Sequence, residues 1–106
     1  METRRKYLFW ENETEFEVVI EYGTYQRGGR LSLSLYRCSE DGSFSDLFDV
    51  VTVNFVESQL LPAKAQFVDI NNHPDIGKWL EENQIAKPLD IYIVSSFCRY
   101  PAYIIL

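Results

Sequence analysis

Two stretches in the first half of the chain alternate between apolar and polar residues, which is the pattern of a β-strand with one buried face. In residues 13–22 four glutamates alternate with apolar or β-branched side chains, and in residues 30–38 leucines alternate with serines. The loop 23–29 between them contains three glycines, which can adopt the positive φ angles of a tight connection. We therefore predict a β-hairpin with one apolar face and one acidic face.

A third strand is predicted to begin near Asp46, after the Asp41-Gly42 pair, because Asp-Gly favours the backbone of a tight turn. The apolar residues between Leu47 and Phe55 do not keep a single parity. This strand therefore requires a bulge or burial on both of its faces.

Three shorter runs in the second half are rich in β-branched and aromatic residues and predict strands at 66–70, 89–94 and 100–106. Pro101 lies inside the last of these runs. Because proline has no backbone N–H to donate to a ladder, Pro101 should lie at a sheet edge, at a strand start or at a bulge.

An amphipathic helix is predicted over residues 74–83, between the first and second of these runs. Its first residue is a proline, whose missing N–H is tolerated there, and His73 would be the N-cap. Ile76, Trp79 and Leu80 recur at helical spacing and should pack against the sheet. The predicted fold class is α+β: a mainly antiparallel β-meander of five or six strands with one amphipathic helix packed on one face.

The length of 106 residues fits a single globular domain, 1–106. No apolar run reaches the roughly 18 residues of a transmembrane helix, and the N-terminal METRRKYLFW has too few apolar residues for a signal peptide. Cys38 and Cys98 lie far apart, without the spacing of a disulfide scaffold, and are interpreted as reduced thiols. These features predict a cytoplasmic protein.

Sixteen acidic and ten basic residues give a net charge of -6, which repels the nucleic acid backbone and anionic lipid. We therefore predict no direct binding to nucleic acid or membrane and favour a basic protein partner. Glu13, Glu15 and Glu17 would recur about every 6.6–6.8 Å along an extended strand, a spacing similar to that of phosphates along one nucleic acid strand. The simpler alternative is a solvated outer face whose charge is balanced by Arg30 across the hairpin.

Side chains suited to ligand binding occur in the turn before the predicted helix and near the C-terminus. The candidate ligand-binding residues are Asp69, Asn71, Asn72, Cys98, Arg99 and Tyr100. Asp and Asn are equally suited to capping a turn, so the first three also have a purely structural interpretation. A Cys98 thiolate activated by His73 and oriented by Asp69 is disfavoured, because no spacing in the sequence brings these residues together.

We assign no catalytic residue, no metal and no cofactor from the sequence. One histidine and two distant cysteines cannot supply a recognisable structural zinc site, which needs four ligands in paired spacings. The carboxylates lack the spacing of a calcium-binding loop.

Two blocks of the second half resemble an uncharacterised bacterial family of similar length, known only as a domain of unknown function. The first block is LPAKAQFVDINNHP at 61–74, followed by WLEENQIAKP, and the second is SSFCRYPAY at 95–103. Ser96 stands where members of that family often have a glycine. The resemblance implies an accessory protein of the kind carried on bacterial mobile elements, without an assigned activity.

These observations favour a non-catalytic protein-binding accessory protein. Its expected contacts are the acidic strand face and two residues of the glycine-flanked loop, Tyr25 and Arg27. A narrower hypothesis is that the acidic face inhibits a basic DNA-processing or defence protein. The alternative is a small enzyme or small-ligand binder built around the Asp69–Pro74 turn and the Phe97–Tyr103 motif.

Overall fold

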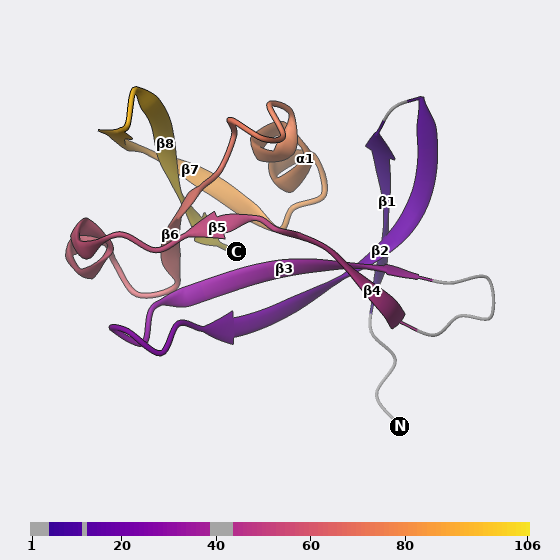
Figure 1. Ribbon diagram of the computed structural model, residues 1–106, viewed down its shortest axis with the longest axis horizontal. Coiled ribbons are helices and arrows are strands. Elements are labelled where there is room, and N and C mark those ends of the chain that lie inside the picture. Colours follow the sequence, from indigo (N-terminus) through magenta and orange to yellow (C-terminus); the bar gives the residue numbers. More distant parts are fainter. Residues whose placement is uncertain (1–4, 12, 39–43) are drawn as a thin grey trace.

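The computed structural model describes residues 5–11, 13–38 and 44–106, which form two four-stranded sheets and two short helices (Figure 1). The first sheet contains β1 (Lys6–Glu11), β2 (Thr14–Thr24), β3 (Leu31–Cys38) and β4 (Phe44–Val50). The second sheet contains β5 (Thr52–Val53), β6 (Ala65–Val68), β7 (Ala86–Ser95) and β8 (Cys98–Ile105). The 3-10 helix η1 (Val56–Leu60) follows β5, and the α-helix α1 (Ile76–Glu82) follows β6.

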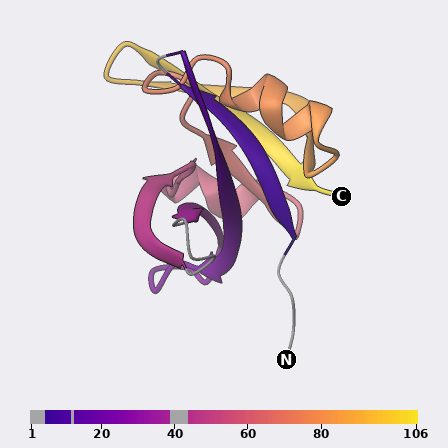
Figure 2. The ribbon, with the colours of Figure 1, turned by 90° about the vertical axis from the view of Figure 1, so that its right-hand side faces the viewer.

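The first sheet is the predicted meander, with the order β1-β2-β3-β4 and antiparallel pairing throughout. The hairpin of β2 and β3 is confirmed, and so is the bulge, because two register shifts interrupt the pairing of β3 with β4. β1 runs beside β2 along its length (Figure 2). β1 was not predicted, because four consecutive large apolar residues, 7–10, hide the alternation of this strand.

The chain crosses from the first sheet to the second at Val51, which lies between β4 and β5. Val51 N donates to the carbonyl oxygen of Leu33 at 2.9 Å, and the carbonyl oxygen of Val51 accepts from Asp69 N at 2.9 Å. The neighbouring Thr52 is buried, and its Oγ1 accepts from Leu33 N at 3.1 Å. The single third strand of the sequence analysis is therefore two strands in two different sheets.

The second sheet has the order β5-β6-β8-β7, so the last strand of the chain lies between β6 and β7. This order corrects the expectation of a simple meander, although each pair is antiparallel as predicted. Pro101 pairs with Tyr92 of β7, whereas β6 pairs only with residues 102–104 of β8. Proline is tolerated at this position because the β6–β8 ladder ends at the Phe67–Ala102 pair, so β6 takes no hydrogen bond from residue 101.

The structure has eight strands rather than the predicted five or six, because β1 was missed and the third strand is divided. The helix is also shorter than predicted, and its N-cap is Asp75 instead of His73. His73 contributes to the start of the helix only through its backbone carbonyl oxygen, which accepts a hydrogen bond from Ile76 N at 3.0 Å. The predicted packing of the helix is confirmed, since Ile76 and Leu80 are buried in the main core and Trp79 packs against it.

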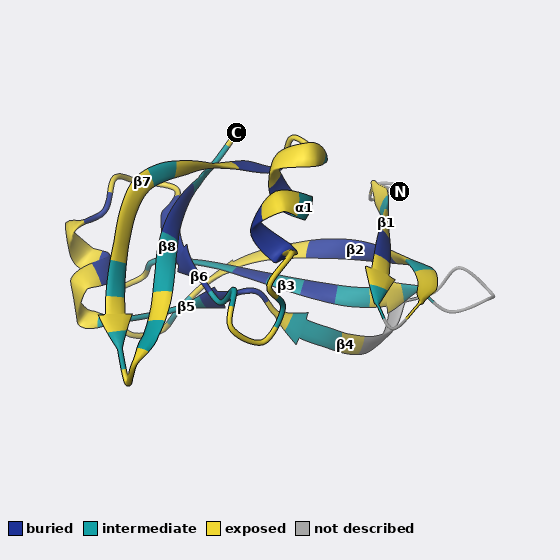
Figure 3. Cartoon of the chain, turned by 90° about the horizontal axis from the view of Figure 1, so that it is seen from above, coloured by how far each residue is buried: buried dark blue, intermediate teal, exposed yellow. Residues whose placement is uncertain are grey.

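The main core joins the first sheet, α1 and one face of the second sheet. Residues of β2 and β3 belong to the same buried cluster as Ile76 and Leu80 of the helix and Tyr103 of β8. A second cluster around Phe67 covers the other face of the second sheet. Gln66 of β6 is fully buried, and its side chain bonds to Ser58, Asn54 and the carbonyl oxygen of Leu31. Buried positions follow the inner strands, whereas β7 is exposed along most of its length (Figure 3).

Candidate functional site

The acidic row lies on the outer face of the β1–β2 hairpin. Glu15 and Glu17 are exposed in β2, and they pair in register with Trp10 and Leu8 of β1. Directly paired residues of an antiparallel ladder share one face, so two carboxylates and two large apolar side chains form a single strip. We call these four residues the hairpin strip. Trp10 is 63% exposed and Leu8 is 56% exposed.

The predicted row is shorter than its sequence indicates. Glu13 precedes β2, in the turn, and has a φ of 61°. Val19, which has the parity of the glutamates, is fully buried between its register partners Lys6 and Tyr36. The regular strand spacing of carboxylates therefore applies to Glu15 and Glu17 and does not extend to Glu13.

Arg30 does not balance the acidic face. Its Nη2 donates to three backbone carbonyl oxygens, those of Leu61 at 3.1 Å, Pro62 at 2.6 Å and Ala65 at 3.2 Å. The expected counter-charge is thus used to join the first sheet to the segment before β6. No cation in the described ranges forms an ion pair with Glu15 or Glu17.

The loop residues Tyr25 and Arg27 differ in their surroundings. Tyr25 is only partly exposed, and its hydroxyl lies 3.0 Å from the carbonyl oxygen and 2.9 Å from Oγ1 of Thr52. Tyr25 therefore anchors the loop to β5. The side chain of Arg27 is exposed, and its carbonyl oxygen accepts from Nδ2 of Asn54 at 3.1 Å.

Asp69 caps its turn, as its structural interpretation predicted. Its Oδ1 accepts from the backbone N–H of Asn71 at 3.0 Å and of Asn72 at 3.3 Å, and its Oδ2 accepts from Nδ2 of Asn72 at 2.6 Å. Nδ2 of Asn71 donates to the carbonyl oxygen of Arg99 at 3.0 Å. This bond joins the two sequence blocks and satisfies β8 beyond the end of β6.

The C-terminal members of the ligand-binding set make contacts within the protein. The Arg99 guanidinium lies 3.9 Å from the centre of the Tyr92 ring, and the Tyr100 ring packs 5.0 Å from that of Phe55. Desolvation, followed by the nearby Cys98 thiol and Asp69 carboxylate, raises the pKa of Tyr100 above its usual value. A phenol with a raised pKa is a poorer general base at neutral pH.

His73 is paired with Asp49. Its Nε2 lies 2.9 Å from Oδ2 of Asp49, and its ring lies against the rings of Phe9 and Phe48. Burial raises the pKa of the Asp49 carboxyl; the Asp69 and Glu11 carboxylates raise it further, whereas His73 and a backbone N–H lower it. The carboxylate beside the imidazole is therefore Asp49, and Asp69 is engaged with the asparagines. Cys38 and Cys98 are both free thiols.

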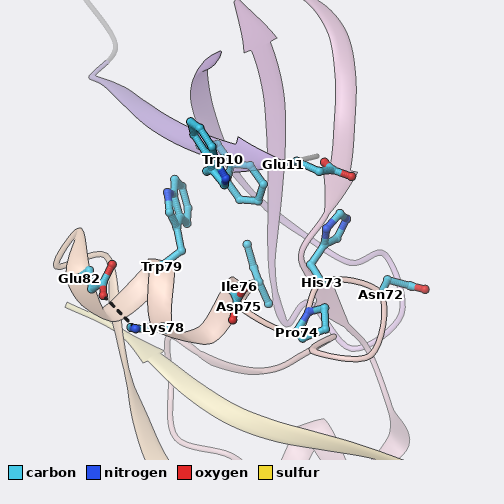
Figure 4. A pocket seen from close by; sticks show the side chains of 11 residues that line it. Trp10, Glu11, Asn72, His73, Pro74, Asp75, Ile76, Lys78, Trp79 and Glu82 are labelled. Atoms are coloured by element: carbon cyan, nitrogen blue, oxygen red, sulfur yellow. Dashed lines mark ion pairs between the residues drawn. The ribbon is translucent and has the colours of Figure 1, made fainter. Parts of the chain in front are cut away.

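A pocket of about 550 Å³ opens between β1, the turn at 72–75 and α1 (Figure 4). Trp10 and Trp79 lie on one side of it, and His73 and Glu11 lie on the other. Asn72 is the member of the predicted ligand-binding set that lines this pocket, and the C-terminal members do not. The hairpin strip and the pocket share Trp10, so the two features are continuous.

Sequence reasoning missed the contribution of β1 to this site. Trp10 and Glu11 follow three other residues of the same strand that are large and apolar, and no spacing links them to the helix. Trp10 could be placed on the same face as the glutamates only with knowledge of the register between β1 and β2, and the sequence does not reveal that register.

No cluster of at least three His, Cys, Asp or Glu side chains has the arrangement of a metal site within 5–11, 13–38 and 44–106. In the same part of the chain, no helix has both the length and the apolar character needed to span a membrane.

Comparison with known proteins gives one informative match. A protein-family model described as a domain of unknown function (DUF4313) matches residues 19–105, which is most of the chain. No curated protein and no solved structure matches the chain.

Proposed function

The chain belongs to this family of domains of unknown function, and we propose from its surface that it is a non-catalytic module that binds a basic protein through the hairpin strip. The strip consists of Leu8, Trp10, Glu15 and Glu17. It lies at the edge of the first sheet, where β1 has no further strand beside it among the described residues.

The observation that supports this proposal is the pairing of exposed apolar side chains with carboxylates in one strip. A face that is merely solvated is mainly polar, whereas interfaces combine large apolar side chains, aromatic ones above all, with a polar rim. The register of the first sheet extends the same face across β3 and β4. Its further members with exposed or half-buried apolar side chains are Tyr36, Leu47 and Val50.

The negative charge of the hairpin strip favours a partner with a basic surface. Glu15 and Glu17 add to a net charge of -6, and the cation expected to neutralise them is bonded elsewhere. An uncompensated acidic strip raises the association rate of a basic partner and disfavours an acidic one. Attraction of this kind weakens with salt, because screening acts over about 8 Å at physiological ionic strength.

The internal contacts of the alternative site favour a structural role for that site. Asp69, Asn71 and Asn72 bond to one another and to the backbone of Arg99. Polar groups that are satisfied within the protein gain little from binding a ligand. We therefore place the turn and the C-terminal motif in the architecture of the second sheet.

The narrower form of the proposal is inhibition of a DNA-processing or defence protein. Such a partner has a lysine- and arginine-rich groove for phosphates, and Glu15 and Glu17 would occupy it as substitutes for two of them. Because the regular spacing covers only these two carboxylates, the apolar members of the strip must supply the remaining contact energy.

The test is affinity capture from a bacterial lysate, read by mass spectrometry at low and moderate salt. We expect the wild type to retain a basic protein that Glu15→Lys/Glu17→Lys loses and that Leu8→Ala retains weakly. Glu57→Lys is the matched control for a single Glu15→Lys, because Glu57 is an exposed carboxylate on η1 and the charge change is identical. If the Glu15→Lys and Glu57→Lys variants both capture less partner than the wild type and capture equal amounts, the loss is an effect of net charge and contradicts the proposal.

For the narrower form, the captured protein is assayed for its own activity in the presence of the wild type. Inhibition that is relieved by Glu15→Lys/Glu17→Lys and by added salt supports it. An undiminished activity of the saturated complex contradicts inhibition while leaving the binding proposal intact.

A further inference from the structure

The pocket beside the hairpin strip has two aromatic surfaces, those of Trp79 and Trp10, and the fold holds the first of them in place. Nε1 of Trp79 donates to the carbonyl oxygen of Leu8 at 2.7 Å, and its ring meets the Phe9 ring at 5.1 Å in an edge-to-face contact. Trp10, from the same strand as Phe9, also lines the pocket and leaves most of its indole accessible. These are the two tryptophans of the chain.

The charged groups that line the pocket are predominantly acidic. Three carboxylates, Glu11, Asp75 and Glu82, line it together with one ammonium group, that of Lys78. Lys78 Nζ lies 3.8 Å from Oε1 of Glu82, and both side chains are largely exposed, so this pair is weak. Nε2 of His73 lies 2.9 Å from Oδ2 of Asp49, so this ring nitrogen is already paired within the protein.

One carboxylate oxygen lacks a partner. Oε2 of Glu11 is shielded from solvent and accepts no hydrogen bond from any group in the described part of the chain. A shielded carboxylate oxygen without a donor is unfavourable, and a hydrogen bond to a charged donor would relieve this cost. The pocket therefore combines aromatic faces, excess negative charge and an unsatisfied acceptor.

We infer that this pocket takes the guanidinium group of an arginine side chain, supplied by the basic protein partner. The inference rests on the proposed function and names the contact that the partner makes. A guanidinium group stacks on an indole face and is more weakly hydrated than an ammonium group, and it has five N–H donors for carboxylates. A volume of about 550 Å³ lies in the range of roughly 300–1,000 Å³ found for ligand pockets.

Because the hairpin strip and the pocket share Trp10, a bound partner segment can contact both. Trp10 pairs with Glu15 on the hairpin strip and also lines the pocket. A basic segment that crosses Glu17 and Glu15 therefore reaches the pocket past Trp10, where one arginine side chain turns inward.

The test uses intrinsic tryptophan fluorescence, because both tryptophans line the pocket and the signal has no other tryptophan source. The probe is the capped tripeptide acetyl-Gly-Arg-Gly-amide, with the citrulline peptide as its uncharged, near-isosteric control and the lysine peptide as its charge control. We expect a saturable change with the arginine peptide, and weaker binding of the citrulline peptide by about tenfold or more, because it lacks charge-assisted hydrogen bonds.

Two variants identify the site. Glu11→Gln retains the size of the side chain and should weaken the arginine peptide about fivefold to tenfold, since it removes the charged acceptor. Trp10→Ala should weaken it by a similar factor through the lost stacking surface. Circular dichroism establishes that each variant is folded. Glu57→Lys, at a residue that does not line the pocket, is the control that should bind as the wild type does.

Equal binding of the arginine and citrulline peptides, or unchanged binding by Glu11→Gln, overturns the inference. The proposed function fails separately. If the partner is lost with Glu15→Lys/Glu17→Lys but retained by Glu11→Gln, the hairpin strip binds it and the arginine inference is overturned. If the arginine peptide binds as expected while partner capture is indifferent to the strip variants, the pocket stands and the strip proposal is overturned.

Discussion

Tyr103 is a residue whose acid–base chemistry is strongly changed by folding. Its side chain is buried in the main core, and its hydroxyl donates to Oε2 of Glu81 at 3.1 Å. Desolvation, followed by the charge and hydrogen bond of Glu81, raises the pKa of Tyr103 from 10.0 to about 12. Gly77 packs directly over the hydroxyl, and a Cβ at that position would collide with the oxygen. The absence of a side chain at Gly77 thus gives the phenol its place under the helix.

This shift predicts a loss of stability in alkali. Below pH 10.0 Tyr103 is protonated in both states, so its contribution is fully present. Between pH 10.0 and about 12 the folded protein binds more protons than the unfolded chain, and the free energy of unfolding falls as the pH rises. Urea midpoints measured across this window should decline more steeply for the wild type than for Tyr103→Phe.

The phenylalanine variant should keep a shallower decline, because the pKa values of Tyr22 and Tyr100 are also raised. Identical slopes for wild type and variant would show that Tyr103 ionises with equal ease in both states.

Residue identity alone revealed local partners and not distant ones. The capping role of Asp69 could be predicted because its donors are two and three positions away. The pairing of His73 with Asp49 could not, since it depends on how β4 is placed beside the turn before α1. For the same reason Arg30 was predicted to balance the charge of the glutamates across the hairpin, whereas its guanidinium donates to backbone carbonyl oxygens of residues 61–65.

At the scale of elements, the β7–β8 hairpin has an unusual turn. Ser95 pairs with Cys98, and the two residues between them, Ser96 and Phe97, have φ values of 50° and 65°. Positive φ at both central positions is the type I′ conformation, which favours Asn-Gly. Phe97 is fully exposed at the tip. Ser96, which stands where members of the resembled family often have a glycine, thus has a backbone conformation that penalises ordinary side chains.

Replacing this turn with the favoured pair should stabilise the protein. Ser96→Asn/Phe97→Gly should raise the free energy of unfolding by about 1 kcal/mol, because strain at two left-handed positions is released. Urea denaturation measures the change, and Phe97→Gly alone should give part of it. A less stable double variant would mean that the exposed phenyl ring contributes contacts that outweigh the strain.

Element prediction succeeded where pairing is local and failed where it is not. The β2–β3 hairpin, its glycine loop and the bulge opposite β3 follow from alternation and turn residues within about 30 positions. The order of the second sheet depends on β8 pairing with both β6 and β7, and nothing in the periodicity of these short runs distinguishes that order from a meander. The pocket was missed because it combines β1 with the helix, about 65 positions away.

For the whole molecule, Arg30 is a connection between its two sheets. It precedes β3 in the first sheet and donates to carbonyl groups of the segment that leads into β6 in the second. Beside it, Gln66 donates to the carbonyl oxygen of Leu31. These bonds add to the main core and to the contacts of Thr52 with Leu33 and Tyr25 in joining the two sheets.

Arg30→Met should lower the free energy of unfolding by about 2 kcal/mol, because charge-assisted hydrogen bonds to carbonyl groups are lost while the aliphatic stem is retained. Arg27→Met, at an exposed position in the same loop, is the matched control and should change stability little. Chemical denaturation followed by fluorescence and by circular dichroism tests this prediction. Arg30→Met stability within error of the control would show that water replaces the three bonds without loss.

The place of β8 in the second sheet also sets a sequence of events during synthesis. The first sheet needs only residues up to 50, each strand pairing with its predecessor, so it can close while the rest of the chain is still being made. The second sheet cannot close in that way, because β6 and β7 have no ladder with each other and must wait for Cys98–Ile105 to enter between them. Until then the edges of β6 and β7 that pair with β8 stay open, and an open strand edge is a template for association with another chain.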